Sequence, residues 1–254
     1  MSDLSVAVAD HVAVMEVQRG PDNYFDQSLL QHIADVGEEL AASRQARVIL
    51  LCSEGRHFCA GANFGAGALR DDRERSAAEV YKQASRLFEL ELPVVAAVQG
   101  SAVGGGLGLA CAADFRVASR RSRFHANFSK LGFHHGFGLS VSLPRIVGPQ
   151  RALELLTTSR RLSGDQAFGM GLVDRLAADG AERDEAHSLA MDIAALAPLA
   201  VRSIKETMTA GLANDVRVAL GRELQEQRRL WKTEDSKIGI AANLDRATPH
   251  FIGE

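Results

Sequence analysis

The sequence predicts an α/β protein in which a mostly parallel β-sheet core is followed by a helical C-terminal region. Strands of about five residues alternate with longer helical stretches, which is the pattern of consecutive β-α-β units. Two strands, Val48–Leu51 and Val94–Val98, are apolar along their whole length, as is typical of strands covered on both faces. With 254 residues, 46% of them hydrophobic, the chain can bury one substantial core with a helical appendage.

The first elements follow from local patterns taken in chain order. Alternating apolar and polar residues on both sides of a polar turn at Ala9–His11 predict two N-terminal strands. Helical periodicity precedes each of the two apolar strands, over Leu29–Ala42 and Asp71–Leu90, and Arg123–Phe128 is predicted to be a further strand.

Beyond Pro198 the pattern is helical, and no Pro- or Ser-rich linker precedes it. We therefore expect a core over residues 1–197 and a helical region over residues 198–254. Its predicted helices are Leu199–Ala210, Asp215–Trp231 and Ser236–Leu244.

Three consecutive glycines, Gly104–Gly106, follow the second apolar strand where a helix begins. Free N–H groups and a partial positive charge make a helix N-terminus a receptor for a negatively charged oxygen. A phosphate-binding P-loop is excluded, because Leu107 and Gly108 stand where Lys and Ser/Thr are required. A dinucleotide fingerprint is excluded because Leu109 stands in place of its last glycine. Taken alone, the glycines are equally consistent with tight packing of helix against strand.

The first apolar strand, Val48–Leu51, also runs into a glycine-bearing loop, CSEGRHFCAGANF. If the two strands are parallel neighbours, the backbone donors of both loops converge on one point. Two convergent N–H groups are what an oxyanion hole requires. The pair of loops therefore predicts a site that stabilises negative charge on a carbonyl oxygen.

Two segments, GRHFCAGANF and AVQGSAVGGGLGLACAADFRVAS, resemble the two signatures of the crotonase (enoyl-CoA hydratase/isomerase) superfamily. Three later segments are similar to later parts of that family in the same order: KLGFHHGFGLSVSLPRIVG, RLSGDQAFGMGLVDRL and TEDSKIGIAANLDRATPHF. The likeness covers nearly the whole chain. It implies a crotonase-like ββα superhelix with a spiral core, whose C-terminal helices cover the pocket and make oligomer contacts in a homotrimer or a dimer of trimers.

The resemblance also implies an acyl-CoA thioester as the substrate. By motif, the N–H groups that hold the thioester oxygen belong to Ala62 and Gly105, and Ala60, Gly61 and Gly104 are expected to contact the substrate beside them. Charge that flows onto this oxygen during enolate formation is what such donors stabilise. No cofactor is expected other than coenzyme A as part of the substrate, and no metal site is expected.

The chain departs from the family at both catalytic glutamates of its hydratases. Gly108 stands at the first position, and Phe128, preceded by Asn127, stands at the second. Neither glycine nor phenylalanine can orient water or deliver a proton. Two-glutamate hydration is therefore not expected, and isomerase, hydrolase, C–C lyase or atypical hydratase chemistry is favoured. The alternative is a non-catalytic protein that binds or carries acyl-CoA.

Two histidines are the candidate replacements for the missing carboxylates. Some relatives place an aspartate in the loop that reads GFHHG here, and its aligned position is Gly136. His135, where the family commonly has proline, or its neighbour His134 could act as acid or base, since imidazole titrates near neutral pH. The alternative is that both are ordinary loop residues. Because neighbours in sequence do not easily point the same way, at most one is expected to reach the pocket.

Further candidates concern substrate binding. Lys205 matches a frequent family lysine near coenzyme A, although an exposed lysine is more often simply solvated. Tyr81 is expected in the pocket wall. Phe128 and Phe133 would make the acyl pocket drier than a two-glutamate site, which favours a bulky apolar acyl group.

Composition limits the remaining possibilities. A net charge of −3 gives no reason to expect a nucleic-acid or membrane partner. The three cysteines, Cys52, Cys59 and Cys111, lack metal-ligand spacing and are interpreted as reduced thiols of a cytoplasmic protein. The N-terminus has neither a basic segment nor a long apolar stretch, so no signal peptide is expected.

Overall fold

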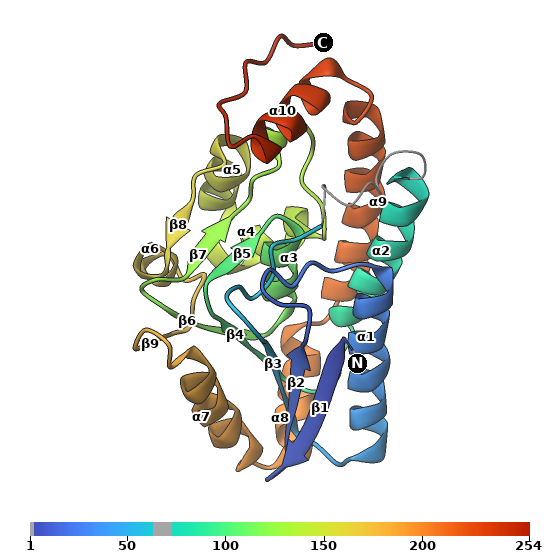
Figure 1. Ribbon diagram of the computed structural model, residues 1–254. Coiled ribbons are helices and arrows are strands. Elements are labelled where there is room, and N and C mark those ends of the chain that lie inside the picture. The colour runs from blue at the N-terminus through green and yellow to red at the C-terminus, as the bar shows by residue number, and fades with distance from the viewer. Residues whose placement is uncertain (1–2, 63–72) are drawn as a thin grey trace.

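The computed structural model describes residues 3–62 and 73–254, and a six-stranded sheet forms the centre of this part of the chain (Figure 1). Its strand order is β1-β2-β3-β4-β6-β9, with β1 antiparallel to β2 and all other neighbours parallel. The predicted parallel pairing of the two apolar strands is confirmed, because β3 pairs directly with β4. The strands are β1 (Leu4–Ala9), β2 (Val12–Val17), β3 (Val48–Ser53), β4 (Val94–Val98), β6 (Phe115–Ser119) and β9 (Arg175–Ala177).

The two apolar strands are buried on both faces because each face meets a different cluster. In β3, Ile49 and Leu51 pack into the large core, whereas Leu50 and Cys52 face a second cluster under α7 (Glu182–Ala194). Side chains alternate between the faces of a strand, so a strand with apolar cover on both faces has no polar positions. The same alternation divides the residues of β4 between the two clusters.

A second, three-stranded sheet has the order β5-β7-β8. Its strands are β5 (Ser101–Val103), β7 (Arg123–His125) and β8 (Leu162–Ser163). The strand predicted over Arg123–Phe128 ends at His125, because Phe128 already has helical dihedral angles and precedes a short 3₁₀ turn, η1 (Ser129–Leu131).

Helices cover both sheets (Figure 1). Asp26 caps α1 by accepting a hydrogen bond from the Leu29 N–H at 2.9 Å. The helix predicted over Asp71–Leu90 is described from Arg73 and ends at Leu87, where Phe88 and Glu89 donate to carbonyls three residues back. The other helices before the C-terminal region are α1 (Gln27–Ser43), α2 (Arg73–Leu87), α3 (Gly105–Ala112), α4 (Leu139–Val147), α5 (Pro149–Thr158) and α6 (Gly164–Gly169).

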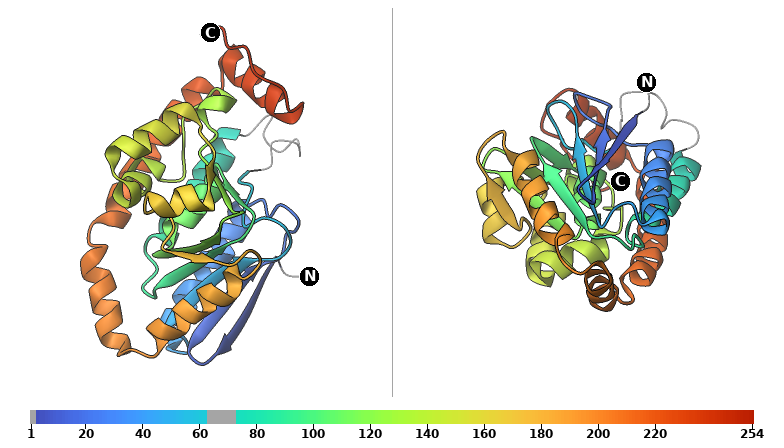
Figure 2. Two further views of the ribbon diagram at one scale, coloured as in Figure 1. Left: turned by 90° about the vertical axis from the view of Figure 1, so that its left-hand side faces the viewer. Right: turned by 90° about the horizontal axis from the view of Figure 1, so that it is seen from below.

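The helices predicted after Pro198 are confirmed as α8 (Pro198–Met208), α9 (Leu212–Leu230) and α10 (Glu234–Leu244). No residue of α8 is buried, and this helix runs along the outer side of the molecule (Figure 2). Helix α9 returns against α2 and α4, and α10 packs on η1. Within residues 3–62 and 73–254, no helix has both the length and the apolar character needed to cross a lipid bilayer.

Candidate active site

The loops that leave β3 and β4 are joined by their backbones, as the sequence predicts. The N–H of Cys59 donates to the carbonyl oxygen of Ser101 at 3.1 Å, and the N–H of Val103 donates to the carbonyl oxygen of Cys59 at 3.0 Å. Cys59 and Ala102 form an isolated parallel bridge between the two segments. Two segments far apart in the sequence therefore reach the site as one rigid unit.

Two glycines permit this close approach. A Cβ atom on Gly106 would lie 2.1 Å from the carbonyl oxygen of Cys59, and one on Gly61 would lie 2.7 Å from the carbonyl oxygen of Val103. Gly61 also has a φ of +88°, which side chains rarely adopt. The Cβ position of Gly61 is 3.5 Å from the backbone nitrogen of Gly105, so the two loop tips are in contact.

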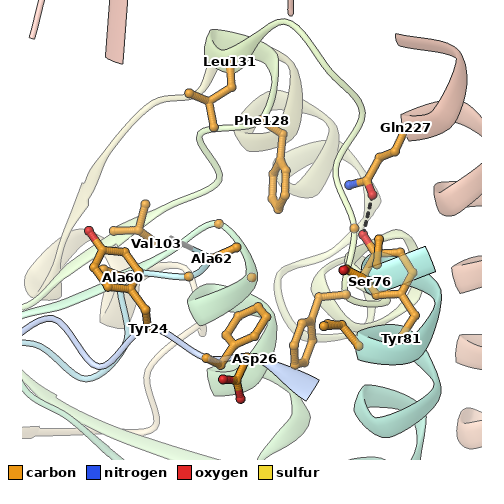
Figure 3. A pocket seen from close by; sticks show the side chains of 18 of the residues that line it. Tyr24, Asp26, Ala60, Ala62, Ser76, Tyr81, Val103, Phe128, Leu131 and Gln227 are labelled. Carbon is orange, nitrogen blue, oxygen red and sulfur yellow. Dashed lines mark hydrogen bonds between the residues drawn. The ribbon is translucent and has the colours of Figure 1, made fainter. Parts of the chain in front are cut away.

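A pocket of about 580 Å³ opens at this junction (Figure 3). As the first residue of α3, Gly105 has an N–H without an acceptor inside its own helix. The pocket is lined by all five residues that the sequence assigns to the thioester site: Ala60, Gly61, Ala62, Gly104 and Gly105.

Phe137 occupies the space where a glutamate at position 108 would project. A Cβ atom on Gly108 would lie 2.5 Å from the Cβ of Phe137 and 2.7 Å from its ring. Phe137 is buried, has a φ of +64° and packs edge-to-face on Phe25, with ring centroids 5.3 Å apart. The loss of the first glutamate is therefore accompanied by an aromatic ring in its place.

Further aromatic rings line the pocket. Phe128 stands at the second glutamate position, lines the pocket and lies 6.1 Å from the ring of Phe133 in a T-shaped arrangement. The ring of Phe133 lies 6.0 Å from that of Trp231, which comes from the end of α9. This wall is apolar and favours an apolar acyl group.

Tyr81 and Gln227 place a polar pair in the pocket. The hydroxyl of Tyr81 donates to Oε1 of Gln227 at 2.7 Å, and Nε2 of Gln227 donates to the carbonyl oxygen of His134 at 2.9 Å. Burial raises the pKa of Tyr81 above its ordinary value, and the nearby Glu223 carboxylate adds to this effect. Tyr81 therefore remains a neutral phenol at neutral pH.

His134 and His135 lie outside the set of residues that line the pocket. Their rings stack, with centroids 4.1 Å apart at 27°, so the two neighbouring side chains point the same way. Nδ1 of His134 lies 2.8 Å from the carbonyl oxygen of His135, which holds its ring over its neighbour. Burial and the neighbouring His134 lower the pKa of His135 to about 4. A catalytic role for either histidine stays a prediction that this placement does not favour.

A buried carboxylate that sequence reasoning missed anchors the same loop. Glu223 on α9 is 0% exposed and accepts hydrogen bonds from the N–H groups of Gly138, at 2.8 Å, and Ser140, at 2.9 Å. Burial raises the pKa of Glu223. Nε2 of His135 lies 2.8 Å from the Ser140 hydroxyl and 3.9 Å from Glu223 Oε1. Glu223 therefore fixes the start of α4 and does not line the pocket.

Two basic residues, Lys205 and Arg19, differ in their position relative to the pocket. Nζ of Lys205 donates to the carbonyl oxygen of Leu92 and to Oδ2 of Asp114, both at 2.7 Å, and Lys205 does not line the pocket. The structure therefore does not bring Lys205 to the substrate site. Arg19 does line the pocket, where its guanidinium lies 3.0 Å from Asp26 and 2.6 Å from Asp3.

Phe25, Phe137 and Gln227 are among the pocket residues that had no role in the sequence analysis. Gln227 is 3% exposed on the inner face of α9, four residues after Glu223. A polar residue at helical spacing on a buried face is a usable signal, but its partner, Tyr81, is far away in the sequence. The two phenylalanines carry no signal that separates a pocket wall from ordinary core.

Sequence comparison identifies the family to which these loops belong. A family model described as enoyl-CoA hydratase/isomerase matches residues 8–254. The chain belongs to this family. A relative in Bacillus subtilis (strain 168), named as a probable enoyl-CoA hydratase, is 31% identical over 258 residues, which cover 100% of both chains. The 1,2-epoxyphenylacetyl-CoA isomerase of Escherichia coli (strain K12) is 30% identical over 238 residues, which cover 91% of each chain.

The fold agrees with that of solved family members. The crystal structure of an enoyl-CoA hydratase/isomerase from Pseudoalteromonas atlantica T6c has a TM-score of 0.88 and 27% sequence identity, and the match covers 99% of this chain and 100% of that one. The predicted crotonase-like α/β fold is thus confirmed.

Proposed function

We propose that the protein is an enzyme that binds an acyl-CoA thioester and stabilises its enolate through the N–H groups of Ala62 and Gly105. The observation that carries the proposal is the contact between the tips of the two signature loops, both of which line one pocket. Membership of the enoyl-CoA hydratase/isomerase family supports a CoA thioester as the ligand. Loss of one such donor typically lowers the rate by about 10²- to 10³-fold.

The proposed reaction is not two-glutamate hydration. Phe137 fills the space beside Gly108, and Phe128 occupies the second position. We propose isomerase, hydrolase, C–C lyase or atypical hydratase chemistry instead. Relatives at similar identity carry both hydratase and isomerase names, so the family alone does not select among these reactions.

The proposed acyl group is bulky and apolar. Phe25 and Phe137 on one side, and Phe128, Phe133 and Trp231 on another, give the pocket aromatic walls. Edge-to-face contacts with such rings favour a ring-bearing acyl group over a short linear one. The name of the Escherichia coli relative, a 1,2-epoxyphenylacetyl-CoA isomerase, is consistent with a ring-bearing acyl group.

A second candidate function is that of a non-catalytic acyl-CoA binding or carrier protein. One observation favours it: among the lining residues in the described part of the chain, Asp26 is the one carboxylate, and Arg19 pairs with it at 3.0 Å. A pocket of this kind can hold an acyl group without a strong base to act on it.

We further propose a cytoplasmic homotrimer or dimer of trimers. The reduced thiols predicted from the sequence are consistent with three buried free cysteines: Cys52, Cys59 and Cys111. The unburied helix α8 offers apolar side chains for contacts between subunits.

The proposed thioester site is tested by substituting Gly105. In Gly105→Ala, the new Cβ would lie 2.4 Å from the ring of Phe25, so the ring or the N–H must move. We expect acyl-CoA binding, measured by isothermal titration calorimetry, to weaken at least tenfold. Gly169→Ala on α6 is the matched control, because no atom lies within 4 Å of its Cβ position. Equal affinity in the two folded variants would contradict the proposed site.

A further inference from the structure

We infer that Tyr81 and Gln227 form a recognition site for a hydroxyl group on the acyl chain. The inference rests on the proposed function and deepens it: the substrate class is a CoA thioester whose bulky, ring-bearing acyl group carries a hydroxyl. It is carried by the position of the pair in the pocket, by its hydrogen-bonding capacity and by the glycine that makes room for it.

The pair lies across the pocket from the proposed thioester site. Figure 3 shows Tyr81 and Gln227 on one side and Ala60 and Ala62 on the other, with the ring of Phe128 between them. A thioester held at Ala62 would therefore direct its acyl chain past the aromatic rings toward the pair. A hydroxyl on that chain would otherwise be desolvated against apolar side chains, which disfavours binding.

The pair retains hydrogen-bonding capacity for a ligand. Gln227 uses one lone pair to accept from Tyr81 and one N–H to donate to the carbonyl oxygen of His134. An amide has two of each, so one N–H and one lone pair remain beyond these contacts. The Tyr81 oxygen donates its proton to Gln227 and keeps lone pairs with which it can accept a hydrogen bond. Donor and acceptor capacity together match a hydroxyl, which both donates and accepts.

Gly136 makes the position of the Tyr81 hydroxyl possible. A Cβ atom at this position would lie 1.7 Å from the Tyr81 oxygen and 2.8 Å from Nε2 of Gln227. Any side chain at position 136 would displace the hydroxyl from the pocket wall. The Tyr81 hydroxyl can therefore occupy this place only because residue 136 is glycine. Position 136 is also the loop position where some relatives are expected to place an aspartate.

The electrostatic setting selects a neutral ligand group. Burial raises the pKa of Tyr81, so the phenol carries no charge at neutral pH, and the Gln227 amide is always neutral. A carboxylate on the acyl chain would meet no compensating charge from either member of the pair, and it would be repelled by the nearby Glu223 carboxylate, whose charge also raises the pKa of Tyr81. A hydroxyl needs no compensating charge.

The test compares ligands that differ by one oxygen atom. Dissociation constants for phenylacetyl-CoA and its ortho-, meta- and para-hydroxylated forms are measured by isothermal titration calorimetry. We expect the protein to bind at least one hydroxylated form about tenfold more tightly than phenylacetyl-CoA, the effect of about one good hydrogen bond. In Tyr81→Phe the preference should fall to within twofold.

Two comparisons separate recognition from a structural role. Gly136→Ala should abolish the preference as Tyr81→Phe does, whereas Gly169→Ala should retain it. Tyr24→Phe removes the other phenol of the pocket, and an equal loss of preference in that variant would contradict the assignment. A purely structural tyrosine would change the melting temperature in Tyr81→Phe and leave the ratio of dissociation constants intact.

The outcomes distinguish this inference from the proposed function. If the protein binds phenylacetyl-CoA but prefers no hydroxylated form, the recognition site is wrong and the acyl-CoA site stands. If it binds no acyl-CoA across the panel, including crotonyl-CoA, both are wrong. A preference that persists in Tyr81→Phe overturns the role of the pair.

Discussion

At the scale of single residues, aromatic side chains fill the space next to two glycines of the site. Phe137 stands where a side chain at Gly108 would be, and the Tyr81 hydroxyl stands where a side chain at Gly136 would be. Each arrangement removes a position from which a carboxylate could act and adds an aromatic surface. The proposed chemistry of the pocket therefore depends on backbone donors and neutral groups more than on charged side chains.

Replacement of Gly108 by alanine provides a test of the first arrangement. Alanine in a helix interior favours folding by about 1 kcal/mol relative to glycine. Here its Cβ would lie 2.5 Å from Phe137, and overpacking typically costs about 1–3 kcal/mol. We expect the cost of overpacking to exceed the gain in helix propensity. Gly108→Ala should therefore lower the free energy of unfolding in urea, whereas Gly169→Ala should not. A stabilised Gly108→Ala protein would show that the ring of Phe137 yields easily.

The half-buried imidazole of His135 predicts a dependence of stability on pH. Its pKa falls to about 4 in the folded protein from an ordinary value of 6.5, because burial disfavours the charged form. Between these values the unfolded chain binds a proton that the folded chain does not. Stability contributed by the neutral imidazole is therefore present above pH 6.5 and is lost as the pH falls toward 4.

The measurement is the free energy of unfolding as a function of pH. We expect the wild-type protein to lose on the order of 3 kcal/mol more than His135→Gln over this interval. The variant is the comparison because glutamine has no charge to gain. Parallel stability curves for the two proteins would contradict the assigned burial of this group.

At the scale of elements, helix α9 determines the shape of the pocket from outside the sheet core. Glu223 and Gln227 are four residues apart on one face of α9, so both point toward the loop between η1 and α4. Glu223 binds the backbone of that loop where α4 begins, and Gln227 binds the carbonyl of His134. Helix α9 is thus part of the pocket wall, through Gln227 at its inner face.

The anchoring role of Glu223 predicts a large effect from a small substitution. In Glu223→Gln one of the two oxygens that accept N–H bonds from Gly138 and Ser140 becomes an amino group, which leaves a buried donor unsatisfied. Such a loss costs about 1–3 kcal/mol. We expect this decrease in the free energy of unfolding, with no comparable effect from Glu206→Gln on the exposed surface of α8. Equal stabilities would mean that the loop does not depend on this carboxylate.

The sequence predicts elements where one physical effect dominates. Strands β3 and β4 were predictable because two-sided burial leaves no polar position, and the glycines because backbones touch there. The end of β7 was not predictable, because the turn at Phe128 depends on packing beyond the strand. The stacking of His134 on His135 follows from a local hydrogen bond that no sequence pattern reveals.

At the scale of the whole molecule, large apolar side chains of α8 stay exposed in a single chain. Leu199 is 78% exposed, Ile204 63% and Met208 66%, on a helix without a buried residue. Contiguous exposed apolar side chains mark interaction surfaces. This exposure supports the proposed homotrimer or dimer of trimers.

The oligomer proposal predicts a change in mass on substitution of α8. Wild-type protein should show the mass of three or six chains by size-exclusion chromatography with light scattering. Ile204→Glu should shift it toward the monomer, because a charge buried in an apolar contact is costly. Ser203→Glu adds the same charge to the neighbouring exposed position and should have a smaller effect. A wild-type monomer would contradict the proposal.

The sequence indicated which backbone groups and aromatic side chains line the pocket, but it did not indicate which side chains bind one another. Ala62 and Gly105 were placed in one pocket from motif and topology, because parallel neighbouring strands bring their exit loops together. Lys205 instead binds Asp114, and the pair formed by Tyr81 and Gln227 joins elements whose packing the sequence does not encode locally. Side-chain partners across the fold required the three-dimensional structure.

Deuterium exchange in the acyl chain tests most directly whether the protein forms an enolate of an acyl-CoA thioester without the two glutamates. Purified protein is incubated in D₂O with crotonyl-CoA and a panel of ring-bearing acyl-CoA thioesters, and the products are analysed by mass spectrometry. We expect deuterium at the carbon next to the thioester carbonyl, without hydration of crotonyl-CoA. Rapid hydration of crotonyl-CoA would contradict the prediction that the protein does not hydrate its substrate without the two glutamates. Tight binding without exchange or product across the panel would contradict the enzyme and identify an acyl-CoA binding protein.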